Sequence, residues 1–552
     1  MTLDTTIARI EALLYNEPCF TSAALLAHDE TATLNEAAEA KLDAMGVSSM
    51  LVGDEGDGIP ASMPKLMGLL RTVCGKDLGF GLGYMITTFM AATNVWQAGS
   101  AVQRRRLSDW LRAGRRVSIA YHELAHGNDM LGNALYATRT EGGYLLNGSK
   151  SVINNIGRAA ALVLQARTDK APGGRSHSLF LIDKADLDPN CFDILPRVQT
   201  DGVRGCQIAG IRFRDCFVAD AYLMGKVGSG TDHAFHAFQI TRGLLPGASL
   251  GAIARALDTT VRYVGTRRLY GATALDIPHV RAQLAESWIE LMLAKRLCRA
   301  SARGLHVVPE EMSILGSVCK FIVPLRMRAV LKRLALVLGS RYYLREGEAA
   351  LFEKVVRDYP AVSLGHASSL SCQAAIIPQL PQILRRFYEG TIEQSEWTMA
   401  LFDDSPLPRF DIGRLRLSCA GKDTLLGSLR HWPRRLEGMR GDGVLYETDY
   451  AQLQRLVTAL EQQVAGLRKS RFEPHDEAAF EATRRYAWVQ CAMAALGAWM
   501  GGWATGVATH PKVMACLLDF VLHQIAQTPF QIDPSIEREL VDDLIGRAKA
   551  SA

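Results

Sequence analysis

The sequence predicts an α+β protein of several domains, because helical, then strand-like, then again helical patterns follow one another along its 552 residues. Residues 1–117 carry apolar side chains at helical spacing. Residues 118–232 consist of short apolar runs between turn residues, which is typical of strands. Residues 233–404 and 405–552 return to helical patterns. We therefore expect an N-terminal helical domain, a middle strand domain, a helical bundle and an additional helical domain.

The strand pattern of the middle region is recognised by its turns. Glu141-Gly142-Gly143 stands between two apolar runs and is a hairpin signal. Further runs follow at 160–167, 178–183, 191–195 and 207–213. Strands at this spacing favour a barrel or a sandwich over a sheet of alternating strands and helices.

The long helical patterns after residue 230 are sufficient for a four-helix bundle. They cover residues 233–265, 277–304, 310–338 and about 383–401. Two prolines in 405–417 indicate a linker, and the patterns beyond it predict further helices at 450–469, 477–497 and 510–526.

The composition is that of a soluble globular protein, with 48% hydrophobic and 22% charged residues. A net charge of +5 is too small to indicate nucleic acid, but it favours anionic ligands such as phosphorylated cofactors or thioester carriers. The eleven cysteines form no CxxC pair, which favours reduced thiols in a cytoplasmic protein over disulfides or a metal site. The most apolar stretch, 491–508, is expected to be a buried helix rather than a transmembrane segment.

The candidate catalytic group is Glu389, in the string Arg386-Phe387-Tyr388-Glu389-Gly390-Thr391. Apolar and aromatic residues precede it, and Gly390 permits a tight backbone directly after it. A carboxylate in such surroundings loses hydration, so its pKa rises and it becomes a stronger base. The alternative is a helix end with a solvated glutamate.

Six short motifs follow one another along the chain. They lie at 98–114, 122–129, 146–150 (Leu-Asn-Gly-Ser-Lys), 213–225, 267–271 and 388–391 (Tyr-Glu-Gly-Thr). In this order they resemble the motifs of the acyl-CoA dehydrogenase family of flavoproteins, over roughly residues 30–400. The resemblance implies that the middle domain is a β-barrel, that 233–404 is a four-helix bundle, and that FAD lies between the two.

The resemblance also implies the reaction, αβ-dehydrogenation of an acyl thioester carried on CoA or on a carrier protein. Glu389 would remove the α-proton, its backbone N–H would bind the thioester carbonyl, and FAD would accept the β-hydrogen as hydride. Arg242 resembles the family's arginine near the substrate, and its alternative role is a salt bridge within the bundle. The family's usual acceptor is an electron-transfer flavoprotein, and its usual assembly is a homodimer or homotetramer.

Positions that match the family's ligand contacts complete the predicted site. The predicted FAD contacts are His122, Gly127, Asn128, Val152, Ile153, Asn154, Arg267, Tyr270, Gly339, Thr391 and Glu393. The predicted substrate contacts are Asn128, Arg242 and Gly390. Arg267 is expected to reach the FAD pyrophosphate of a neighbouring subunit, because a guanidinium suits such an anion.

The chain departs from the family pattern at the flavin. His122 replaces a threonine, Asn128 a serine, and Val152-Ile153-Asn154 replaces Trp-Ile-Thr. His122 and Asn154 can still donate hydrogen bonds, but Leu336 cannot replace the amide of the family's glutamine. Two alternatives therefore stand beside the dehydrogenase, namely a flavin-dependent oxidase or monooxygenase on the same fold and a flavin-free scaffold. The insertion 345–380 and the extension 405–552 could shape the acyl pocket, dock a carrier protein or bury a subunit contact.

Overall fold

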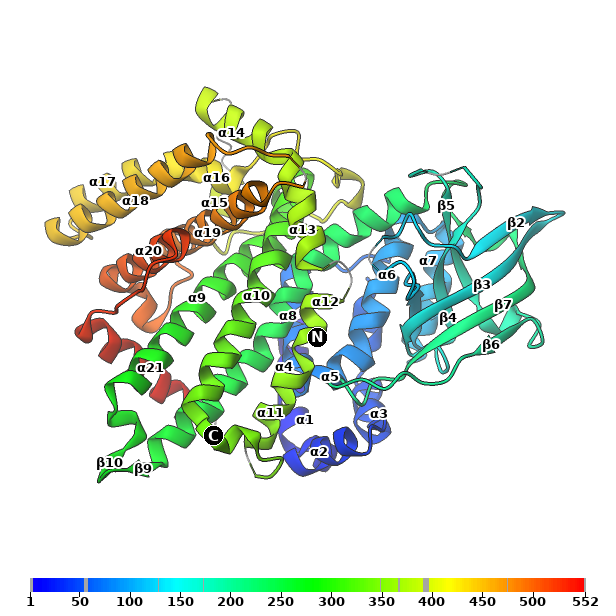
Figure 1. Ribbon diagram of the computed structural model, residues 1–552, viewed down its shortest axis with the longest axis horizontal. Helices are drawn as coiled ribbons and strands as arrows, with labels where there is room; N and C mark the ends of the chain where they lie inside the picture. Colours follow the sequence, from blue (N-terminus) through cyan, green and yellow to red (C-terminus); the bar gives the residue numbers. More distant parts are fainter. Residues whose placement is uncertain are drawn as a thin grey trace. The chain divides into compact units, whose positions relative to one another are not determined.

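A computed structural model describes residues 3–53, 58–127, 129–171, 173–347, 349–365, 368–390, 397–473 and 475–550. Its contacts divide the chain into two compact units, Met1–Thr241 and Arg242–Ala552 (Figure 1). The first unit holds helices and a sheet, and the second is almost entirely helical.

Side-chain caps begin several helices of the first unit. The side chain of Asn35 accepts the N–H of Ala38 at 3.1 Å at the start of α3 (Glu36–Ala44), and Ser100 and Gln103 form a capping box before α7 (Ala101–Arg112). The π-helical turn η3 (Leu82–Ile86) joins α5 (Leu78–Gly81) to α6 (Thr87–Ala98). The other helical elements are α1 (Leu3–Asn16), η1 (Pro18–Phe20), α2 (Ser22–Glu30), η2 (Ser48–Leu51) and α4 (Met63–Lys76).

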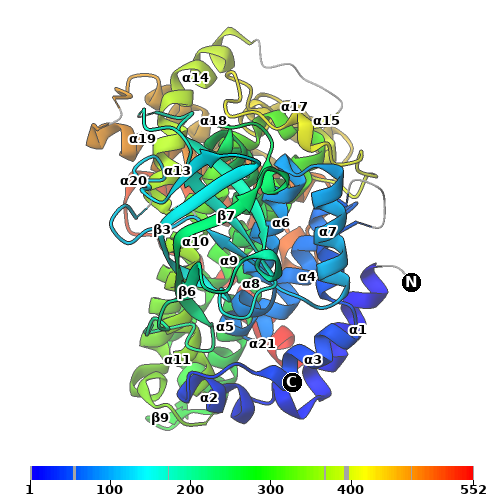
Figure 2. The ribbon, with the colours of Figure 1, turned by 90° about the vertical axis from the view of Figure 1, so that its right-hand side faces the viewer.

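One eight-stranded sheet follows, with the pairing path β6-β7-β3-β2-β4-β5-β8 and with β1 parallel to β4. Its longest pair, β3 and β7, is antiparallel and lies beside β6 in Figure 2. The predicted hairpin is confirmed, since Thr140 of β2 stands opposite Gly143 of β3. The strands are β1 (Val117–Ala120), β2 (Tyr136–Thr140), β3 (Gly143–Asn154), β4 (Ala161–Arg167), β5 (His177–Asp183), β6 (Phe192–Ile194), β7 (Ile208–Ala219) and β8 (Leu223–Met224).

The predicted closure of this sheet into a barrel is wrong. No pairing among the described strands joins β6 to β8, so the path stays open. Both of these strands are short, three and two residues, and therefore offer few backbone groups with which to close a ladder. The apolar interior that the strand pattern predicts is nevertheless present, with Leu146, Phe180 and Phe213 fully buried.

The prediction that all cysteines are reduced is also wrong for one pair. Cys191 and Cys216 form a disulfide, with 4.9 Å between their Cα atoms. Their sequence separation is 25 residues, and the sheet brings them together because β6 pairs with β7. The other nine cysteines form no disulfide.

The second unit begins within the long helix α8 (Gly230–Thr266) and continues through a small hairpin, β9 (Arg268–Leu269) and β10 (Ala272–Thr273). The helices that follow are α9 (Pro278–Val307), α10 (Met312–Leu338), α11 (Ala349–Asp358), α12 (Pro360–Leu364), α13 (Ser369–Ile376), α14 (Leu380–Glu389), α15 (Trp397–Ala400), α16 (Thr424–Gly427), α17 (Trp432–Gly441), α18 (Glu447–Leu467), α19 (Glu477–Met500), α20 (Pro511–Ala526) and α21 (Pro534–Ala550).

Helices from both sides of the predicted linker pack together in this unit. α10 packs against α9 and α13, and α19 packs against α9, α10 and α20 (Figure 1). The extension beyond residue 405 therefore shares the interior of the same helical unit. No helix in the described part of the chain has the length and apolar character needed to cross a membrane.

A pair of buried carboxylates helps to hold the extension to this interior. Glu311, at the start of α10, accepts the backbone N–H and the hydroxyl of Thr424 at 2.7 and 2.8 Å. Asp423 accepts hydrogen bonds from the side chains of Tyr486 and Gln490 on α19. Burial raises the pKa of Glu311 to about 7, against the hydrogen bonds from Thr424.

Replacing Glu311 with glutamine is expected to reduce the loss of stability between pH 5 and 8. Because the folded pKa lies above the usual value of 4.5, the native chain holds its proton longer than the unfolded chain and loses stability as pH rises from about 4.5 to about 7. The full change is on the order of 3 kcal/mol. Urea unfolding at pH 5 and at pH 8 measures this change in stability. Glu310→Gln is the matched control, and its effect on the pH dependence of stability should have the opposite sign, since Arg414 outweighs burial and lowers the pKa of Glu310. If the free energy of unfolding changes with pH in the same way in the wild type and in Glu311→Gln, the raised pKa does not belong to Glu311.

Candidate functional site

The loop after β1, which carries several predicted flavin contacts, is fixed to β3 by a buried ion pair. Lys150 on β3 donates to a carboxylate oxygen of Glu123 at 2.8 Å and to the carbonyl of Tyr121 at 3.1 Å. Burial lowers the pKa of Lys150 to about 8 against the opposing charge of Glu123. Burial alone would raise the pKa of Glu123, but Lys150 and two backbone N–H donors outweigh it and lower the pKa. The pair therefore sets where His122 lies.

His122 itself is half-buried, and its Nδ1 lies 3.3 Å from the carbonyl of Gly127. Burial lowers its pKa, so the ring is neutral at pH 7. A neutral ring that donates through Nδ1 presents Nε2 as an acceptor, whereas the sequence led us to expect a donor. Gly127 adopts φ 55° with no atom within 4 Å of the position a Cβ would take. Asn128 lies outside the described residues.

The three predicted flavin contacts at the end of β3 differ in their exposure and in their hydrogen bonds. A register shift between Lys150 and Ile153 turns Val152 outward, 39% exposed, and turns the side chain of Ile153 into the sheet core. The amide nitrogen of Asn154 donates to the hydroxyl of Thr87 at 2.8 Å, while its Oδ1 is buried and has no hydrogen-bond partner among the described residues. Asn154 thus retains an acceptor that suits the N–H of a flavin ring.

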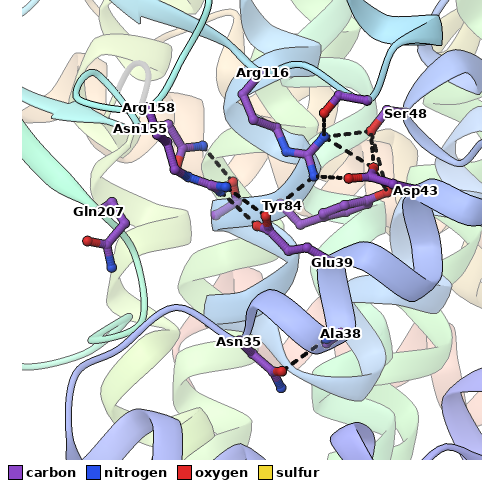
Figure 3. A network of polar contacts seen from close by, with 12 residues as sticks. Asn35, Ala38, Glu39, Asp43, Ser48, Tyr84, Arg116, Asn155, Arg158 and Gln207 are labelled. Carbon is purple, nitrogen blue, oxygen red and sulfur yellow. Dashed lines mark hydrogen bonds and ion pairs between the residues drawn. The ribbon is translucent and has the colours of Figure 1, made fainter.

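A buried ionic network lies beside these elements (Figure 3). Arg116, just before β1, donates to Asp43 at 2.8 and 3.2 Å and lies over the ring of Tyr84, 4.4 Å from its centroid. Arg158 donates to both oxygens of Glu39 at 2.6 and 2.7 Å. Because Arg116 also contacts Glu39, the two arginines and two carboxylates form one connected group.

The same network reaches the end of β3. Arg158 donates through Nε to the side chain of Asn155 at 2.8 Å, and Asn155 in turn donates to the carbonyl of Gly83 at 2.7 Å. Asn155 directly follows Asn154, so the network fixes the position of that predicted flavin contact. The sequence analysis missed these residues because their partners are far apart in the chain, with a sequence separation of 119 between Arg158 and Glu39.

In the helical unit, Arg242 is half-buried and donates to the hydroxyl of Ser317 on α10 at 3.2 Å. Arg267 is exposed at the end of α8, and Tyr270, in the tight turn between β9 and β10, is 99% exposed. Gly339 ends α10 with φ 60° and open space around it. These positions are accessible to a ligand or to another subunit, whereas Leu336, which stands for the family's glutamine, is an exposed apolar side chain.

Glu389 is the last residue of α14, and Gly390 ends the helix in the left-handed conformation with φ 68°. The side chain of Glu389 is exposed, so the predicted burial among apolar residues is wrong and the local geometry is the solvated helix end given as the alternative. Thr391 and Glu393 lie outside the described residues.

Residues of the extension support this helix end. The guanidinium of Arg430 lies 4.6 Å from the ring centroid of Phe387 and 3.8 Å from the position that a Cβ on Gly390 would take. Arg468 lies 5.2 Å from the ring centroid of Tyr388. The extension therefore places two guanidinium groups beside the end of α14.

Part of the helical unit matches a known protein family. Residues 228–366 match the family model described as the C-terminal domain of acyl-CoA dehydrogenase. The match includes Arg242, Arg267, Tyr270 and Gly339 and ends before Glu389.

Two relatives are similar over shorter stretches. Mitochondrial isovaleryl-CoA dehydrogenase of Solanum tuberosum is 26% identical over 224 residues, which cover 40% of this chain and 54% of that protein. L-prolyl-(peptidyl-carrier protein) dehydrogenase of a Serratia species is 26% identical over 226 residues, 41% of this chain and 56% of that protein. The chain thus spans about half the length of these relatives.

The solved structure of butyryl-CoA dehydrogenase from Megasphaera elsdenii shares the fold of this chain. It superimposes with a TM-score of 0.62 at 19% identity, over 69% of this chain and 98% of that one. The remaining residues of this chain extend beyond the shared core. The chain is a distant member of the acyl-CoA dehydrogenase family.

Proposed function

We propose that the protein is an FAD-dependent dehydrogenase that introduces a double bond between Cα and Cβ of an acyl thioester. The match of residues 228–366 to the family's C-terminal domain carries this proposal. FAD, when bound, supplies the acceptor for the β-hydrogen. The chain supplies the base for the α-proton, for which Glu389 is the candidate, and the polar groups that hold the ligands.

Several residues have geometries that fit these roles. The unpartnered Oδ1 of Asn154 can accept the N–H of a flavin ring, and His122 can contribute a second polar contact. Arg242, half-buried beside Ser317, can bind the thioester substrate. The exposed carboxylate of Glu389 requires the bound acyl chain to exclude water around it, because a desolvated carboxylate is the stronger base.

The names of the two relatives include a CoA thioester and a carrier-bound substrate, and both remain substrate classes for this chain. We further propose a cytoplasmic homodimer or homotetramer that passes electrons to an electron-transfer flavoprotein or a similar acceptor. The hairpin after α8 supports an assembly of this kind, because it presents Tyr270 and Arg267 to the outside.

Arg267→Ala is expected to weaken FAD binding roughly tenfold or more, because one charge-assisted hydrogen bond to a pyrophosphate is lost. Quenching of flavin fluorescence on titration measures the dissociation constant. Arg268→Ala is the matched control, as Arg268 is exposed on the same hairpin. An unchanged dissociation constant in Arg267→Ala would remove Arg267 from the site.

The visible absorption spectrum, recorded before and after anaerobic addition of a CoA thioester, tests the proposed function. Flavin bands near the usual ~450 nm that bleach with the thioester would support it. Oxygen consumption without an added electron acceptor would indicate the oxidase or monooxygenase instead. A colourless protein that cannot be reconstituted with FAD would support the flavin-free scaffold.

A further inference from the structure

Lys320 is a buried lysine that the proposed reaction leaves without a role. It is 3% exposed and is the one charged residue in the buried part of α10 from Met312 to Pro324. Its ammonium donates to the carbonyl of Val362 on α12, the one acceptor it has among the described residues. An ammonium has three donors, so the contact leaves two of them for other groups.

The surroundings of Lys320 are positive and contain hydroxyls and thiols. Arg242 lies close enough to influence its ionisation, and so do the buried thiols of Cys319 and Cys372. Arg242 donates to Ser317, which precedes Lys320 by about one helical turn. The hydroxyl of Ser363, next to Val362, is buried and has no hydrogen-bond partner within the described residues.

The two other lysines that are buried among the described residues have carboxylate partners. Lys150 pairs with Glu123 at 2.8 Å, and Lys354 pairs with Asp358 at 2.6 Å. Lys320 makes no ion pair with a carboxylate of the described residues. Burying an ammonium without a counter-ion is unfavourable. An anion bound beside Lys320 would remove this penalty.

We propose that Lys320 and Arg242 bind a carboxylate carried by the acyl group, so that the substrates are thioesters of dicarboxylic acids. This inference rests on the proposed function, because Arg242 is a predicted substrate contact. A carboxylate has four acceptor positions, which suit the ammonium, the guanidinium and the free hydroxyl of Ser363. A permanent anion explains the site better than the transient enolate, since the charge of Lys320 is buried in the resting protein as well.

Kinetics with matched pairs of thioesters test the proposal. Each pair consists of a dicarboxylic thioester and the monocarboxylic thioester of the same chain length, such as glutaryl-CoA and pentanoyl-CoA. We measure kcat/KM for both and divide the value for the dicarboxylic thioester by the value for the monocarboxylic one. Lys320→Met is expected to lower this ratio roughly tenfold to a hundredfold, because one charge-assisted hydrogen bond to the carboxylate is lost. Lys332→Met, an exposed lysine on the same helix, should leave the ratio as in the wild type. An unchanged ratio in Lys320→Met would overturn the proposal.

Thermal unfolding of the ligand-free protein gives a second readout. Lys320→Met should raise the melting temperature, because it removes a buried charge that has no carboxylate partner among the described residues, whereas Lys354→Met should lower it by removing the ion pair with Asp358. A lower melting temperature in Lys320→Met together with an unchanged ratio would assign Lys320 to the structure alone. Lys320→Gln keeps donors without the charge and provides the same comparison if the methionine variant does not fold.

Calorimetric binding of glutaryl-CoA separates this inference from the proposed function. If no thioester is oxidised but glutaryl-CoA binds and Lys320→Met abolishes that binding, the dehydrogenase fails and the carboxylate site stands. If thioesters are oxidised and Lys320→Met binds glutaryl-CoA as the wild type does, the dehydrogenase stands and the carboxylate site falls.

Discussion

Replacing Glu389 with glutamine is expected to lower the rate of acyl-thioester dehydrogenation at least roughly a hundredfold, the effect of losing a general base. The amide of glutamine has the same shape but cannot accept the α-proton. Because the Glu389 side chain is exposed at the end of α14, the substitution should leave the fold and bound FAD unchanged. Exchange of the substrate α-proton with deuterium from the solvent, followed by NMR, measures the step that Glu389 is proposed to perform.

Glu461→Gln is the matched control for this experiment. Glu461 lies on α18, and its charge influences the ionisation of Tyr388, next to Glu389. If Glu389 is the base, Glu461→Gln retains proton exchange. If Glu389→Gln exchanges the α-proton at the wild-type rate, the base is another residue, and the loss of exchange in Glu461→Gln would identify it.

Replacing Arg116 with methionine is expected to lower the free energy of unfolding of the first unit by about 3–5 kcal/mol. The substitution leaves Asp43 without its main cationic partner and weakens the connection to Glu39, while both carboxylates remain largely enclosed. It also removes the guanidinium from the ring of Tyr84. Urea unfolding followed by circular dichroism measures the change.

Arg139→Met is the surface counterpart, since Arg139 pairs with Asp220 where both side chains are about half exposed. Solvent weakens such pairs, so this variant should unfold close to the wild-type urea concentration. Because the network fixes Asn155, Arg116→Met should also weaken FAD binding. Equal unfolding midpoints for the two variants would show that the buried network contributes no more to stability than a surface pair.

The sequence predicted the local features of the site better than its assembly. Gly390 was expected to permit a tight backbone directly after Glu389, and it ends α14 in the left-handed conformation with φ 68°. The exposure of Glu389 could not be deduced, because burial depends on segments that approach from elsewhere in the chain. Lys320 did leave a signal, a single charge in a long apolar helical run, but its meaning depended on the absence of a nearby carboxylate among the described residues.

By itself, the sequence determined the order of helices and strands, the hairpin at Gly142 and the family to which the chain belongs. These features depend on local periodicity and turn chemistry, which neighbouring residues encode directly. Only the tertiary structure decided that the sheet stays open, that Arg116 and Arg158 join Glu39, and that Arg430 lies beside Gly390. Such contacts join segments far apart in the chain, and their energies arise from burial and charge pairing that no local pattern specifies.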